Sequence, residues 1–373
     1  LFEPVYGEAG GPFEVIAPRF SDVPSHVDKQ TYRGNTLSTS TVVTAKAAWE
    51  NIYMVEVVRS CPELCRFCLA SYLTLPFRTA PLEKSLIPAI DRGLAVTNRL
   101  GLLGASVTQH PEFDDLLEHL NRPQYDDVRI SIASVRTNTV TSKLADVLVK
   151  HDTQSITIAV ESGSERVRRV VNKKLETDDI IIAAENAKVG GLKSLKLYGM
   201  VGIPGEEMDD VEQTVQMMHT IKKAVPGLKL TLGCSTFVPK SHTPFQWYGV
   251  NSQSDKRLKY LQKHLRSNGI DFRPESYKWS VIQALLSRGD RRISYILEKV
   301  RGYGNSLGSY RRAFKDLRGT LPSLDFYVHQ EWSPEQSLPW QHLNGPLPIS
   351  TLVKHLEDAR THMTTGQSSP TEI

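Results

Sequence analysis

Short apolar runs rich in β-branched residues alternate with longer amphipathic stretches between residues 51 and 250. This alternation is typical of parallel β-strands that are joined by α-helices. The apolar runs predict six strands, at residues 52–58, 100–105, 128–135, 155–160, 195–201 and 228–237. The sequence therefore predicts an α/β fold, a partial (β/α)6 barrel of the TIM type, with its chemistry at the C-terminal ends of the strands.

The pattern differs on both sides of this region. Residues 1–50 are rich in Gly, Pro, Ser and Thr and begin with Leu1, so we expect a linker or the remnant of a missing upstream domain there. Residues 251–373 show helical periodicity and then prolines from Pro322 to Pro348. The sequence thus predicts a barrel at 51–250 and, at 251–373, a mostly helical, loop-rich extension with a basic segment and a Pro-rich acidic tail.

The composition, with 40% hydrophobic and 23% charged residues, is that of a globular protein. The sequence contains neither an apolar run that predicts a membrane span nor a secretory leader. Three of the four cysteines lie within residues 61–68. This clustering favours metal or redox chemistry over a disulfide framework and predicts a cytoplasmic location or another reducing compartment.

Cys61, Cys65 and Cys68 are spaced as C-x3-C-x2-C directly after the first predicted strand. Three thiolates from one loop can hold three irons of a 4Fe–4S cluster, which leaves the fourth iron open to a small molecule. A structural zinc site normally has four protein ligands, and the loop has neither a second cysteine pair nor a histidine. The motif therefore predicts a cluster site, and an inert trio of buried cysteines is the alternative.

This motif, with an aromatic residue before the last cysteine, resembles that of the radical S-adenosylmethionine (radical SAM) superfamily. The resemblance covers about residues 52–248 and implies a partial barrel, a 4Fe–4S cluster on the three cysteines, and S-adenosylmethionine as cofactor. In this family one electron from the cluster cleaves the carbon–sulfur bond of the cofactor and yields a 5′-deoxyadenosyl radical. The resemblance thus implies an enzyme, whose substrate, reaction and catalytic residues are unknown.

The resemblance also implies cofactor contacts at the strand ends. Phe67 would pack near the adenine and Glu161 would contact the ribose, while residues 101–111 lack the Glu of the family's Gly-Gly-Glu segment. Arg166 or Arg168 would pair with the carboxylate of the cofactor, and a helix-surface salt bridge is the equal alternative. The expected contacts are Phe67, Gly104, Ala105, Glu161, Ser162, Arg166, Gly202, Ile203, Gly205, Phe237 and Val238.

Other polar residues in the predicted strands are candidates for substrate or cofactor contact, namely Ser131, Ser134, Arg136, Lys196 and Tyr198. Cys234 is interpreted as a small buried hydrophobe. Segments 237–247, 287–292 and 338–342 resemble an uncharacterised family with a cobalamin-binding-like domain ahead of the radical SAM domain. Cobalamin is therefore expected only through a missing upstream domain, because His26 lacks the surrounding motif.

Charge is unevenly distributed along the chain. Between Lys256 and Arg318 the chain contains sixteen Lys and Arg but only five Asp and Glu. From Gly319 onward it contains two Lys and Arg and six Asp and Glu. A basic patch can bind RNA, which makes an RNA-modifying methylthiotransferase or methylase an alternative, although a solvated helical surface explains the same charge. The arginines that carry this alternative are Arg288, Arg291, Arg292, Arg311 and Arg312. A non-catalytic redox-sensing iron–sulfur protein is another alternative, and an enzyme would need an electron donor such as flavodoxin or ferredoxin.

Overall fold

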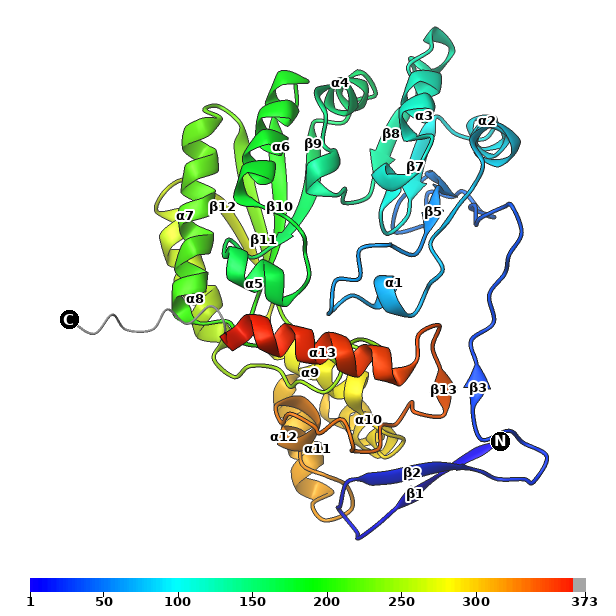
Figure 1. The fold of residues 1–373 in the computed structure, drawn as a ribbon, viewed down its shortest axis with the longest axis vertical. Helices are drawn as coiled ribbons and strands as arrows, with labels where there is room; N and C mark the ends of the chain where they lie inside the picture. The colour runs from blue at the N-terminus through cyan, green and yellow to red at the C-terminus, as the bar shows by residue number, and fades with distance from the viewer. Residues whose placement is uncertain (365–373) are drawn as a thin grey trace.

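The computed structural model describes residues 1–364. Parallel strands form an open barrel wall from two sheets, with the orders β4-β7-β8 and β9-β10-β11-β12 (Figure 1). A parallel bridge between Val135 and Ile158 joins the two sheets. The strands are β4 (Tyr53–Glu56), β7 (Arg99–Leu103), β8 (Arg129–Ile132), β9 (Ser155–Glu161), β10 (Ser194–Val201), β11 (Lys229–Thr236) and β12 (Asp271–Pro274).

The predicted α/β fold with parallel strands is confirmed, and each of the six predicted strands is present. The structure adds a seventh, β12, inside the segment that the sequence predicts as mostly helical. Thr231 of β11 lies opposite Asp271 of β12, and Gly233 lies opposite Arg273. Within β12 only Phe272 is buried, so no apolar run marks this strand in the sequence.

Helices cover the outer face of the barrel, where β-strands alternate buried and partly exposed positions. In β10 every second residue from Leu195 to Val201 is buried, while Lys196 and Met200 are half-buried and Tyr198 is exposed. The helices of this layer and its connections are α1 (Leu69–Tyr72), α2 (Ile87–Leu94), α3 (Phe113–Leu120), α4 (Ser142–Lys150), α5 (Glu165–Val170), α6 (Thr177–Val189), α7 (Met208–Ala224) and α8 (Ser254–Arg266). Short helical turns are η1 (Leu82–Leu86), η2 (Val107–Gln109), η3 (Pro123–Tyr125) and η4 (Thr137–Thr139).

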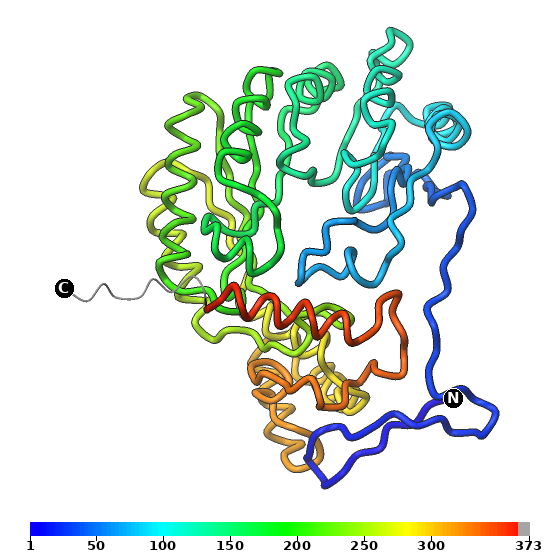
Figure 2. Tube along the Cα trace, in the orientation of Figure 1, coloured from blue at the N-terminus to red at the C-terminus, as the bar shows by residue number. Residues whose placement is uncertain are grey.

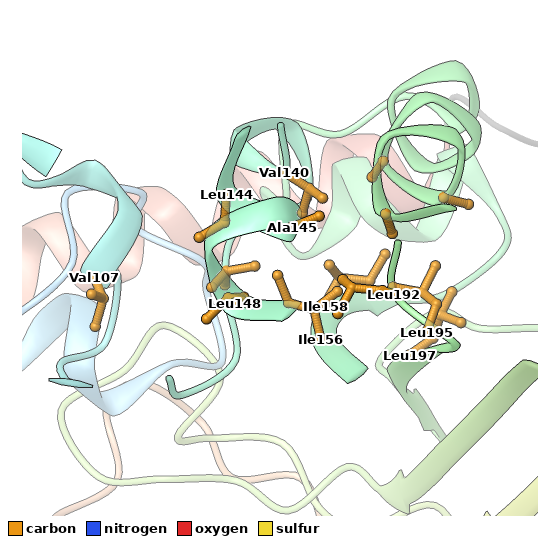
Figure 3. Close-up of a cluster of buried hydrophobic side chains, with 14 of the residues drawn as sticks. Val107, Val140, Leu144, Ala145, Leu148, Ile156, Ile158, Leu192, Leu195 and Leu197 are labelled. Carbon is orange, nitrogen blue, oxygen red and sulfur yellow. The ribbon is translucent and has the colours of Figure 1, made fainter. Parts of the chain in front are cut away.

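The barrel core lies between these helices and the strands. Figure 3 shows Leu144 and Leu148 of α4 next to Ile156 and Ile158 of β9. All four side chains are almost completely buried. Burial of aliphatic side chains of this size contributes about 1.5–3 kcal/mol each relative to exposure, so this layer holds the strands in place.

A second core lies below the C-terminal ends of the strands (Figure 1). It contains the helices α9 (Tyr277–Arg288), α10 (Ile293–Tyr303), α11 (Leu307–Asp316), α12 (Leu324–Val328) and α13 (Ile349–Thr364). Helix α13 crosses under α5 and α1 in Figures 1 and 2. The hydroxyl group of Tyr72 in α1 is hydrogen-bonded to Nδ1 of His355 in α13 at 2.7 Å, which ties this C-terminal unit to the barrel.

The first 50 residues contain an antiparallel hairpin of β1 (Phe2–Tyr6) and β2 (Phe13–Pro18). A short strand β3 (Val27–Asp28) pairs with β13 (Leu343–Asn344). The chain then runs along one side of the molecule to the barrel (Figure 2). Two further strands, β5 (Val58–Arg59) and β6 (Arg78–Thr79), form a ladder that brackets the cysteine loop. No helix among the described residues is both long and apolar enough to cross a membrane.

Candidate functional site

The three clustered cysteines lie in the loop between β5 and α1, close to the C-terminal end of β4. Cys65 is buried, whereas Cys61 and Cys68 are partly exposed, and all three thiols are free. The loop is tightly wound, with positive φ angles at Ser60 and Leu64. The N–H group of Cys68 donates a hydrogen bond to the carbonyl oxygen of Cys65 at 2.8 Å. The loop therefore presents the thiols from one compact turn.

The thiols influence one another electrostatically. Burial is the main cause that raises the pKa of Cys65 to about 12; Lys173 opposes the rise, and Cys68 and Cys61 add to it. Burial also raises the pKa of Cys68. Within residues 1–364, no three or more Cys, His, Asp or Glu side chains are arranged around a common ion position. Three thiols on one loop beside a buried cation fit the donor set of a 4Fe–4S cluster with one open iron.

Lys173 forms a buried ion pair with Glu161 at the end of β9. The Nζ atom of Lys173 lies 2.8 Å from Oε1 of Glu161. Burial lowers the pKa of Lys173, but Glu161 and Cys65 outweigh this effect and leave the pKa above its ordinary value. Glu161 has a φ of 66°, where the pairing register of β9 with β10 shifts. This strained position directs the predicted ribose ligand toward a cation that the sequence analysis does not predict.

Glu63, inside the cysteine motif, connects the loop to neighbouring strand ends. It accepts a hydrogen bond from Nε2 of Gln109 at 2.6 Å and forms an ion pair with Arg136 at 3.1 Å. The side chain of Asn172 donates to the carbonyl oxygens of Glu63 and Leu64. Arg136 is a predicted candidate and Glu63 is not, because only the folded barrel brings these two side chains together.

Gly104 lies after β7 at a φ of 156°. A Cβ atom there would lie 2.5 Å from Cγ2 of Val58 and 2.7 Å from its carbonyl oxygen. Glycine is therefore required by the packing of this turn against β5, whatever else binds nearby. Ala105 is exposed beside it, whereas Ser106 is buried and donates to Oε1 of Gln109 at 2.5 Å.

The turn after β9 has local roles for the predicted ligands Ser162 and Arg166. The hydroxyl oxygen of Ser162 accepts a hydrogen bond from the N–H group of Ser164. Arg166 forms an ion pair with the buried Asp210 of α7 and donates to the carbonyl oxygen of Gly205 at 2.8 Å. Arg166 therefore joins α5 to α7, as the salt-bridge alternative predicts.

The turn after β10 is held by hydrogen bonds to Glu206 from Gly202 of the turn and from Arg257 of α8. Gly202 and Gly205 both have a φ of 75°, which favours glycine. The N–H group of Gly202 donates to Oε2 of Glu206 at 2.6 Å, and the same oxygen accepts from Nη1 of Arg257 at 2.8 Å. Burial raises the pKa of Glu206 to about 7, and Arg257 opposes part of this shift. Ile203 is completely buried in the second core.

The aromatic residues predicted to contact adenine also belong to the second core. Phe237 is 1% exposed and stacks edge-on against Phe245, with ring centroids 5.9 Å apart. Val238 is buried in the same cluster, and Phe67 is half-buried against it. In this structure these side chains pack the barrel against the C-terminal helices, and their cofactor contacts stay predictions.

A cavity of about 460 Å³ lies on the inner face of the second sheet. Its lining includes Glu161, Lys196, Tyr198, Arg273 and Glu275. The backbone of Cys234 also lies in this wall, but its side chain is 3% exposed, as expected for a small buried hydrophobe. The inner face of the second sheet is therefore hollow, with charged side chains set among an apolar lining, and Glu161 of the Glu161–Lys173 pair lies in its wall.

The basic segment is less exposed than its sequence suggests. Arg288 is 1% exposed, donates to backbone carbonyls of α12 and lies over the ring of Trp332 at 3.7 Å. Arg292 is buried against Asp290, with Nη2 and Oδ2 2.8 Å apart. Arg291, Arg311 and Arg312 are exposed. Arg288 and Arg292, two of the five arginines on which the RNA alternative rests, are therefore buried and bonded within the protein rather than exposed to bind RNA.

Residues 55–218 match the family model of the radical SAM superfamily. The chain is 33% identical over 257 residues to an uncharacterised protein of Methanocaldococcus jannaschii, covering 68% of this chain and 55% of that protein. It is 27% identical to tRNA-2-methylthio-N(6)-dimethylallyladenosine synthase of Neorickettsia sennetsu, covering 58% of this chain and 48% of that protein. The chain thus spans about half the length of these relatives.

Among solved structures, the chain is similar to the radical S-adenosylmethionine methyltransferase TsrM from Kitasatospora setae. The TM-score is 0.44 at 11% identity, over 84% of this chain and 61% of that protein. The family match begins in β4 and ends in α7, so it includes the cysteine loop, Lys173 and the turn at Gly202. Residues 55–218 of this chain therefore form a domain of the radical SAM superfamily.

Proposed function

We propose that this protein is a radical SAM enzyme that holds a 4Fe–4S cluster on Cys61, Cys65 and Cys68. The observation that supports this proposal most directly is that the three thiols lie on one loop of a radical SAM domain and are close enough to affect one another's pKa. When bound, the cluster supplies the electron that cleaves S-adenosylmethionine to a 5′-deoxyadenosyl radical.

The residues around the loop stabilise negative charge on the cysteine thiolates and hold the loop in place. Lys173 provides a buried positive charge that favours the thiolate form of Cys65, and Glu161 keeps that lysine charged. Glu63 anchors the loop to Gln109 and Arg136, so the three thiols keep their relative positions. Helix α13 runs beneath α1 and α5 next to this region (Figure 1), and the hydrogen bond between Tyr72 and His355 fixes it to α1.

S-adenosylmethionine would bind at the strand ends next to the loop. We assign its contacts to the predicted set. Phe67 lies inside the cysteine loop, and Glu161 is close enough to affect the pKa of Cys65. Gly104, Ala105, Ser162, Gly202 and Gly205 would supply backbone contacts. Arg166 is the least suited of the set, because Asp210 already neutralises its guanidinium group.

Anaerobic reconstitution with iron and sulfide, followed by reductant and S-adenosylmethionine, tests the proposal. We expect 5′-deoxyadenosine, which chromatography detects, and we expect C68A to lose both the visible absorbance of the cluster and the cleavage. The matched control is C234A, which removes a buried thiol outside the motif and should retain both. A reconstituted cluster that never cleaves the cofactor would instead support the redox-sensing alternative.

RNA modification is a second candidate, favoured by the similarity to a tRNA methylthio-synthase. The basic residues left for it are the exposed Arg291, Arg311 and Arg312. If RNA is the substrate, the triple Arg→Gln variant should bind tRNA more weakly. The slope of log K against log salt concentration should also become shallower, by the equivalent of up to about three phosphate contacts. Filter binding at several salt concentrations measures both quantities.

The remaining partners follow from the same proposal. The electron would come from a small redox protein such as flavodoxin or ferredoxin, in a reducing compartment such as the cytoplasm where the free thiols persist. Cobalamin is not assigned to any residue of the described range. Cobalamin absorbance in the protein purified after growth with cobalamin, or its absence, tests whether cobalamin is bound.

A further inference from the structure

The inner face of the second sheet carries two rows of side chains that the parallel register sets side by side. Thr157, Lys196, Thr231 and Asp271 form one row across β9 to β12. Ala159, Tyr198, Gly233 and Arg273 form the next row. The two rows are about 7 Å apart, because each residue of a strand advances about 3.3 Å. This face lines the cavity of about 460 Å³.

Tyr198 has a flat, open ring at the centre of this face. Its side chain is 51% exposed although it lies inside the barrel. A Cβ atom on Gly233 would lie 3.1 Å from Cδ1 of the tyrosine ring, so the ring lies along the bare backbone of β11. With Ala159 on its other side, the ring has small neighbours in its row and can stack on a planar group.

Lys196 lies within β10 and Arg273, whose side chain is 64% exposed, lies within β12, whereas Glu161 and Glu275 lie at the C-terminal ends of β9 and β12. No hydrogen bond or ion pair to the ammonium group of Lys196 occurs among the described residues. Arg273 uses its Nε atom on Asp271 at 2.8 Å, which leaves its terminal nitrogen atoms for another acceptor. Glu275 directly follows β12, and Glu161 is already paired with Lys173.

Resting on the proposed function, we infer that this cavity binds the substrate, and that the substrate carries a planar ring and an anionic group. The ring stacks on Tyr198, and the anion, a carboxylate or a phosphate, is held by Lys196 and Arg273. The opposite end of the substrate then points to the C-terminal ends of the strands, where the Glu161–Lys173 pair and the cysteine loop lie. Glu275 repels a second anionic group at that end.

Ligand-observed NMR on the apo protein tests this binding without turnover. The probes are 3-phenylpropionate, phenyl phosphate and phenethylamine, which share a ring and differ in charge. A ligand of this size binds with a Kd of about 1 mM. We expect the two anions to bind and the cation not to bind, and the tighter anion identifies the carboxylate or the phosphate class.

K196M and Y198A should each weaken binding of the preferred anion at least about fivefold, and G233A should weaken it by displacing the ring. The matched control is K193M, an exposed lysine just before β10, which should bind as the unaltered protein does. Circular dichroism melts identify variants that have unfolded. The inference is overturned if no anion binds, if phenethylamine binds equally well, or if folded K196M and Y198A bind normally.

The outcome of these binding measurements is independent of the cofactor-cleavage assay that tests the proposed function. Loss of cofactor cleavage with intact anion binding would reject the radical SAM activity and keep the cavity as an anion site. Cleavage without anion binding would keep the activity and reject the substrate class.

Discussion

Lys173 is the residue that links the cysteine loop to the end of β9. Its ammonium group lies 2.8 Å from Glu161, and its charge lowers the pKa of Cys65. Both members of the pair are nearly buried, with side chains 12% and 9% exposed. Removing one partner of a buried ion pair leaves an uncompensated charge, whereas removing both is often tolerated.

We therefore expect K173M to lower the free energy of unfolding of the apo protein by about 3–5 kcal/mol and the double variant E161Q/K173M to recover most of it. The control is K174M, because Lys174 is 57% exposed and its change should have little effect. Urea unfolding of the four proteins measures this. An equal loss in K173M and the double variant would show that the two side chains are not coupled.

At the scale of elements, the turn between β10 and α7 is held by one buried carboxylate. Glu206 accepts hydrogen bonds from Gly202 of the turn and from Arg257 of α8. Burial raises its pKa from 4.5 to about 7. Between these two values the folded protein binds more protons than the unfolded chain, so the free energy of unfolding falls as the pH rises.

The contribution of Glu206 should lower stability by on the order of 2–3 kcal/mol between pH 4.5 and pH 7. In E206Q this carboxyl no longer titrates, so the stability difference between the variant and the unaltered protein should change with pH across that window. Unfolding in urea at pH 5, 6, 7 and 8 follows the change, with E185Q as an exposed control. A difference that stays constant with pH would contradict the shifted pKa.

At the scale of the whole molecule, the N-terminal hairpin is fixed to the C-terminal helices by Arg292. Its guanidinium group pairs with Asp290, donates to the carbonyl oxygen of Gly11 at 3.0 Å and lies over the ring of Tyr6 at 4.1 Å. The hydroxyl group of Tyr327 donates to the same carboxylate at 2.7 Å. One buried arginine therefore joins segments that are more than 280 residues apart.

R292M should lower the free energy of unfolding by about 3–5 kcal/mol, because Asp290 would stay buried without a counter-charge. Residues 7–12 of the hairpin should also be cleaved faster in limited proteolysis. R291M is the matched control, since the neighbouring arginine is exposed. Identical proteolysis of both variants would mean that other contacts hold the hairpin.

The alternation of apolar runs and amphipathic stretches is enough to predict the parallel strands, because each strand buries a continuous outer face under helices. The cysteine spacing is local, so the cluster loop is also predictable. Strand β12 is not, since only Phe272 of its four residues is buried and Arg273 lines the cavity. Likewise, the stretch 256–318 is basic in sequence, yet Arg288 and Arg292 are buried by partners from other segments.

By itself, the sequence determined the class of fold and predicted a cluster-binding loop, because periodicity and the spacing of cysteines are properties of contiguous residues. Only the tertiary structure decided which charges meet. Glu161 pairs with Lys173, which lies beyond helix α5. Glu63, in the loop after β5, pairs with Arg136, in the loop after β8, and Lys196 and Arg273 face one cavity from different strands. Pairing of this kind depends on register and on chain crossings, which no local pattern of residues encodes.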